Sequence, residues 1–157
     1  MRYSKSKLLY QDKPTYGLLL KLVLIVPVAF LAGSLYLYLS GDVSGSLDLL
    51  LGALISGLIF WFVFPREYQL YDDHLRIALG GPFSVKVRFR NVKTIRITNR
   101  TGLTVNFVTR ITKRYTEIVK KRGWNIAITP TSSDAFVEKA NRALEQWVRT
   151  QREMGMT

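Results

Sequence analysis

The chain has 157 residues, no Cys, one His and a formal net charge of +12. Without Cys, a disulfide framework and thiolate chemistry are both excluded. The charge is uneven, because residues 66–157 hold 18 Lys and Arg against 8 Asp and Glu, a net charge of +10. Such a basic balance favours contact with polyanions, either anionic lipid or nucleic acid.

Two long apolar segments, residues 22–39 and 46–64, dominate the N-terminal half. The first has no charged residue, and the second contains only Asp48. As α-helices they would be about 27 and 28 Å long, close to the hydrocarbon thickness of a bilayer. Because backbone groups inside a bilayer must be hydrogen-bonded within their own segment, we expect two membrane helices. The polar residues 40–45 between them predict a turn.

Two other interpretations of these segments are disfavoured. A buried helical hairpin in a soluble protein would outgrow the core of so small a chain. A cleavable signal peptide is disfavoured because the first segment is long, the second follows directly, and residues 29–34 contain no clear cleavage pattern. Pro27 lies inside the first segment and predicts a kink there.

The distribution of Lys and Arg predicts the orientation. Residues 1–21 carry five Lys and Arg against one Asp, whereas the turn at 40–45 carries neither Lys nor Arg. Arg66 follows the second segment directly. Because positive residues stay on the cytoplasmic side, we expect a multi-pass protein of the cell membrane with both termini in the cytoplasm. Residues 1–21 are then a basic cytoplasmic segment that precedes the hairpin of residues 22–64.

After Pro65, alternating apolar and polar residues predict about seven short antiparallel strands. The expected strands are 67–71, 74–79, 83–90, 94–98, 103–107, 115–120 and 124–129. In the last of them, Trp124, Ile126 and Ile128 are expected to share the buried face.

A C-terminal helix is predicted after the sheet. Pro130 ends the sheet, and apolar residues then recur at helical spacing. The residues of that stripe are Phe136, Ala140, Ala143, Leu144 and Trp147. They predict an amphipathic C-terminal helix that packs on the sheet.

A curled antiparallel sheet closed by a C-terminal helix is the arrangement of pleckstrin-homology domains. The tail resembles the bacterial pleckstrin-homology-like family, whose small domains often lie beside transmembrane helices. The resembling pieces are residues 71–75, 89–92 with Ile95, 123–126, 128–130 and 134–137. This resemblance implies an α+β domain over residues 66–150, with a curled sheet or partly open barrel capped by the helix, and a short tail at 151–157. It also implies that exposed sheet edges self-associate or accept a peptide strand.

Few residues of the sequence suggest catalysis. His74 is the only histidine, and Asp72 and Asp73 precede it in a predicted β-turn, where Asp is favoured for backbone hydrogen bonding. The sequence has no phosphate-binding loop, no dinucleotide-binding glycine motif and no zinc-protease motif. We therefore expect no enzyme, no cofactor and no metal. The alternative is a membrane-associated enzyme or enzyme subunit, which a concave site joining these three residues to a further carboxylate would favour.

The basic face of the strand at 83–90 is the better candidate site. Lys86, Arg88 and Arg90 alternate with apolar residues and therefore point the same way. Arg96 is expected to project from the neighbouring strand on the same face. Like charges side by side in a sheet are mildly destabilising, so the gathering of these cations on one face needs an explanation.

Three interpretations of this face stay open at the level of sequence: it is only solvated, it contacts anionic lipid headgroups, or it binds a partner protein. Nucleic acid is disfavoured, because no helix-turn-helix pattern is present and no aromatic residues are interleaved with the cations. The resulting prediction is a membrane-anchored, non-enzymatic binding or scaffolding module. A second copy of the chain and another membrane protein are its candidate protein partners.

Overall fold

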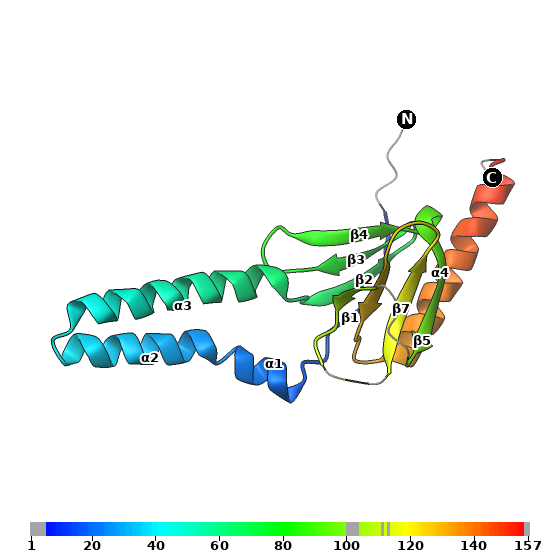
Figure 1. Cartoon of the computed structure of the whole chain (residues 1–157). Helices are drawn as coiled ribbons and strands as arrows, with labels where there is room; N and C mark the ends of the chain where they lie inside the picture. The colour runs from blue at the N-terminus through cyan, green and yellow to red at the C-terminus, as the bar shows by residue number, and fades with distance from the viewer. Residues whose placement is uncertain (1–5, 100–103, 111, 113, 156–157) are drawn as a thin grey trace.

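The computed structural model describes residues 6–99, 104–110, 112 and 114–155. Its elements are β1 (Leu8–Asp12), α1 (Leu18–Val23), α2 (Val26–Leu39), α3 (Val43–Val63), β2 (Glu67–Tyr71), β3 (His74–Ala78), β4 (Ser84–Arg88), the 3₁₀ turn η1 (Phe89–Asn91), β5 (Val92–Thr98), β6 (Thr104–Phe107), β7 (Tyr115–Lys120), β8 (Asn125–Ile128) and α4 (Ser133–Glu153). A long helical hairpin projects from one end of a β-rich domain, and α4 packs along that domain (Figure 1).

The hairpin is formed by α2 and α3. The spans Leu20–Leu39 and Val43–Val63 are long and apolar enough to cross a membrane, as the sequence predicts. Most of their apolar side chains are exposed in the isolated chain, which suits a surrounding of lipid. Asp42 caps α3 by accepting a hydrogen bond from the Gly45 amide at 2.9 Å.

Two small polar residues join the helices inside the hairpin. The Ser34 hydroxyl donates to the carbonyl oxygen of Ser46 at 2.8 Å, and both side chains are buried. The first helix is interrupted as Pro27 predicts: α1 ends at Val23, and α2 begins at Val26 with the proline in its first turn. That position tolerates proline because the amide it lacks would have no helical partner there.

A strand that the sequence analysis did not predict precedes the hairpin. β1 pairs antiparallel with β2, so that Tyr10 lies opposite Leu70 and Asp12 opposite Tyr68. The two apolar helices therefore form the connection between two paired strands. The domain includes residues on both sides of the hairpin.

The eight strands of the described residues form two sheets of four. The first has the order β1-β2-β3-β4 and is antiparallel throughout. The second has the order β5-β7-β8-β6, and in it β6 runs parallel to β8. One core joins both sheets to α4. Its fully buried side chains include Tyr68, Leu75, Phe89, Ile118 and Phe136. The coarse architecture of an apolar helical hairpin joined to an α+β domain with a C-terminal helix is as expected.

The segment between β1 and α1 holds the two sheets together. Thr15 donates its amide to Thr129 O at 3.1 Å, and Gly17 donates to Thr109 O at 2.8 Å. The Tyr16 hydroxyl donates to the carbonyl of Pro65, where the chain leaves the hairpin. Both ends of the hairpin are therefore held by the folded domain.

The C-terminal helix lies on the core as predicted, with Phe136 and Ala140 fully buried. The start of α4 is joined to the end of β1, because Asp12 accepts a hydrogen bond from the amide of Ser132, the N-cap residue, at 2.9 Å. The expectation for Trp124 is wrong. β8 begins one residue later, at Asn125, and the indole is 60 % exposed.

Candidate functional site

The strand that carries the predicted basic face lies at the edge of the first sheet. β4 pairs only with β3 and has no strand on its other side among the residues described. Leu79 N donates to Phe83 O, and Phe89 N donates to Asp73 O, each at 3.0 Å. In an antiparallel pair, residues directed toward the partner alternate with residues directed away from it. The backbone groups of residues 84, 86 and 88 therefore point to the free edge.

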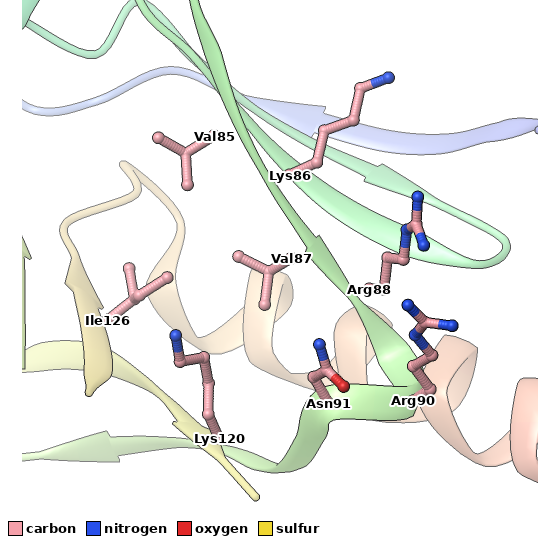
Figure 2. A pocket seen from close by; sticks show the side chains of 8 residues that line it. All are labelled: Val85, Lys86, Val87, Arg88, Arg90, Asn91, Lys120 and Ile126. Atoms are coloured by element: carbon pink, nitrogen blue, oxygen red, sulfur yellow. The ribbon is translucent and has the colours of Figure 1, made fainter. Parts of the chain in front are cut away.

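A groove of about 290 Å³ opens beside this edge, between β4 and the β7–β8 hairpin. Its lining residues are Val85, Lys86, Val87, Arg88, Arg90, Asn91, Lys120 and Ile126. Figure 2 shows that Val85 and Val87 project to the side of β4 on which Ile126 lies, whereas Lys86 and Arg88 project to the opposite side. The groove thus has an apolar floor and a cationic rim.

Four cations surround this groove. Lys86, Arg88 and Arg90 are exposed, Lys120 is half-buried, and none of them forms an ion pair with a described residue. Like charges in one small region repel each other, and an anionic ligand would relieve that repulsion. The described lining holds no carboxylate, imidazole or hydroxyl group.

Lys120 and Asn91 are members of the groove that the sequence analysis missed. A hydrogen bond of 2.8 Å from Lys121 N to Asn91 O joins η1 to the end of β7, and so brings Lys120 beside β4. From the sequence, Lys120 is expected only as the last residue of the strand at 115–120. Its position beside β4 depends on pairing between segments about thirty residues apart.

Arg96 is not part of this groove. It lies on β5 in the second sheet, and the expectation that it projects beside β4 is wrong. The reason is η1, which turns the chain out of the first sheet directly after β4. The Arg96 guanidinium instead lies 2.9 Å from the buried carboxylate of Glu117, which also accepts a hydrogen bond from Asn125.

The only acid–histidine cluster lies in the turn between β2 and β3. His74 Nδ1 is hydrogen-bonded to Asp73, and its ring stacks on Tyr71 with centroids 4.5 Å apart. Asp72 accepts a hydrogen bond from Lys7 N, which links the turn to β1. Burial raises the pKa of Asp73, but hydrogen bonds from His74 and Ser6 outweigh it, so the pKa is lowered overall. Among the described residues, no three His, Asp or Glu side chains gather as a metal site would require.

The groove is oriented away from the hairpin. Phe83, just before β4, packs on Phe62 of α3 with ring centroids 5.1 Å apart. From there β4 runs away from the hairpin (Figure 1). With a rise of about 3.3 Å per residue, Lys86 and Arg88 lie roughly 10 and 17 Å along the strand beyond Phe83. The cationic rim therefore starts near the end of α3 and extends away from it.

Comparisons with known protein families, with curated protein sequences and with solved structures find no match to this chain. What the groove can do therefore follows from its own chemistry. A free strand edge can donate and accept backbone hydrogen bonds, the apolar floor can bury side chains, and the rim can bind negative charge.

Proposed function

We propose that this chain is a membrane-anchored, non-enzymatic binding module, and that the groove beside β4 is its binding surface. One observation carries the proposal: four cations without ion-pair partners among the described residues surround a groove at a free strand edge. The described lining consists of cationic, amide and apolar side chains, which supports recognition of an anionic ligand.

The proposed topology has two membrane spans with both termini in the cytoplasm. Pairing of β1 with β2 supports it, because the two strands flank the hairpin and must lie on the same side of the membrane. The basic residues beside both ends of the hairpin favour the cytoplasmic side. At the domain end of α3, the Arg66 guanidinium lies 3.9 Å above the Trp61 ring, an arrangement suited to the water–lipid boundary.

We also propose that the domain is pleckstrin-homology-like. A four-stranded antiparallel meander, a second sheet and a C-terminal helix packed on their shared core support this likeness. Two features depart from the expected arrangement. The hairpin is inserted between β1 and β2, and β6 joins its sheet in parallel with β8.

The direction of β4 favours a partner in the aqueous phase over the leaflet in which the hairpin lies. A charge is screened within about 8 Å at physiological ionic strength. Lys86 is the nearest of the three β4–η1 cations to Phe83, at roughly 10 Å along the strand and so close to that reach, whereas Arg88 and Arg90 lie well beyond it. Anionic headgroups of the same leaflet remain the second candidate ligand, through Lys86.

Photocrosslinking in intact cells tests the proposal. A photoreactive amino acid replaces Arg88 in one variant and Arg142, exposed on α4, in the matched control. We expect a discrete adduct from position 88 that position 142 does not give, and mass spectrometry will show whether it is protein or lipid. A lipid adduct would identify the leaflet as the ligand. Absence of any adduct specific to position 88 would contradict a binding role for the groove.

A further inference from the structure

We infer that the groove takes an extended acidic segment of a partner protein, which adds as a fifth strand to the free edge of β4. This inference rests on the proposed function and assigns the ligand of the same site. The segment would carry acidic side chains at alternate positions, next to Lys86 and Arg88, with apolar side chains between them.

The backbone of β4 provides the first part of the recognition. The two hydrogen bonds that flank the β3–β4 pair direct the amide and carbonyl groups of Ser84, Lys86 and Arg88 to the open side. Such a row of unpaired groups is a template for another strand. The neighbouring sheet leaves room there, because the groove separates β4 from β7 and β8.

The side chains of β4 determine the sequence pattern. In a sheet, residues directly opposite each other have Cβ atoms about 5 Å apart and lie on the same face. Residues of the added strand opposite Lys86 and Arg88 would therefore meet two exposed cations, so that acids are favoured there. The residue between them would lie opposite Val87 and face the apolar floor that includes Val85 and Ile126. The favoured order is acid, apolar, acid.

Charge disfavours the two nearest alternative occupants. If β4 paired with β4 of a second copy, Lys86 and Arg88 of each copy would face a strand carrying the same cations, which is destabilising. The chain itself has no two acidic residues separated by one position, so it contains no segment of the required pattern. An acidic strand from a different protein satisfies both the backbone and the charge of this edge.

Peptide binding to the full chain in neutral-lipid nanodiscs tests this inference. The probe is a fluorescent peptide with a Glu-Val-Glu-Val-Glu core and soluble flanks. The control peptide has the same composition with its acids in one block and its valines in another. We expect fluorescence anisotropy to show at least tenfold tighter binding of the alternating peptide. N-methylation of the backbone amides that face β4 is expected to abolish that preference, and hydrogen exchange at residues 84–88 is expected to slow on binding.

A variant separates the role of this edge from general attraction to a basic protein. Lys86→Glu with Arg88→Glu is expected to weaken binding of the acidic peptide at least tenfold and to favour a Lys-Val-Lys-Val-Lys peptide. Lys93→Glu with Arg152→Glu, at two exposed positions outside the groove, makes the same change in net charge and is expected to preserve the preference. Equal binding of alternating and block peptides, with no effect of N-methylation, would overturn strand addition. The photocrosslink from position 88 would persist in that case, so the two proposals fail separately.

Discussion

A Cβ atom built on Gly80 would lie 1.5 Å from the carbonyl oxygen of Trp61. The end of α3 and the turn after β3 thus touch backbone to backbone, and only glycine allows this approach. The Phe62–Phe83 ring pair extends the same contact. The domain is therefore docked against the helical hairpin rather than attached to it by a flexible linker, which fixes the direction of β4.

Replacing Gly80 by Ala is expected to break this docking. The Trp61 carbonyl oxygen is held in place by the helical backbone of α3, so the turn after β3 must shift instead. We expect this shift to lower the free energy of unfolding by about 2–4 kcal/mol. Thermal unfolding of the full chain in detergent, followed by near-ultraviolet circular dichroism, measures the effect. Gly57→Ala is the matched control on α3, because a Cβ there meets no atom within 4 Å. Equal stability of the two variants would show that the contact is not formed.

The hairpin and the C-terminal helix could be predicted because their patterns are long and local. Residues 22–64 carry a composition that suits lipid, and Phe136 and Ala140 recur at the period of a helix. β1 could not be predicted, because five residues with the sequence LLYQD show little alternation and their partner lies beyond the hairpin. The pairing of β1 with β2 depends on the folding of the whole domain, which local sequence patterns do not reveal.

The candidate site was found only in part, for a related reason. Alternation of apolar and polar residues continues from β4 through Phe89 and Arg90, although the strand ends at Arg88. Phe89 is still buried, so the pattern conceals the turn that moves Arg96 into the other sheet. Lys86, Arg88 and Arg90 were identified from sequence, but the groove exists only where β7 and β8 approach β4.

Arg96→Met is expected to destabilise the domain by about 1–3 kcal/mol, because it leaves the buried Glu117 carboxylate without its cation. The loss is limited because Arg96 is itself largely exposed, and solvent screens its charge. Adding Glu117→Gln to the variant is expected to restore part of the loss, because a buried amide costs less than a buried unpaired charge. Urea unfolding of both single variants and the double variant gives the coupling energy. Lys93→Met, on the same strand, serves as the control. Additive effects at Arg96 and Glu117 would contradict the ion pair.

Tyr68 predicts how stability depends on pH above neutrality. Burial raises the pKa of this tyrosine to about 12, and its hydroxyl donates to Phe107 O at 3.0 Å. The unfolded chain loses this proton near pH 10, so the stabilising contribution is complete below that pH and is lost as the pH rises toward 12.

Tyr68→Phe is accordingly expected to cost about 1 kcal/mol at pH 7, from the lost hydrogen bond. Above pH 10 the variant is expected to approach the parent in stability and then to exceed it. Urea unfolding of both proteins at pH 7, 10 and 11 makes the comparison. Tyr10 and Tyr115, whose pKa values burial also raises, are present in both proteins and cancel. A constant difference across this range would contradict the raised pKa of Tyr68.

The inserted hairpin predicts how a soluble form of the domain must be built. Residues 66–157 alone lack β1, and are expected to expose the edge of β2 and to aggregate. A chain in which a short Gly-Ser linker replaces residues 18–64 is expected to fold, because the Tyr16–Pro65 hydrogen bond holds its two joining points close together. Size-exclusion chromatography and amide proton dispersion in NMR spectra compare the two. Equal folding of both would show that β1 is dispensable.

The pairing of β1 with β2 also links the completion of the domain to its biosynthesis. β1 leaves the ribosome before the membrane helices and stays unpaired until β2 has followed them. If only one helix entered the bilayer across its full width, the two strands would be separated by the membrane and the first sheet could not close. With the proposed two-span topology, only a chain whose hairpin has returned to its starting side can pair β1 with β2 and reach the native state. Misinserted copies would keep exposed strand edges, which quality-control proteases can recognise.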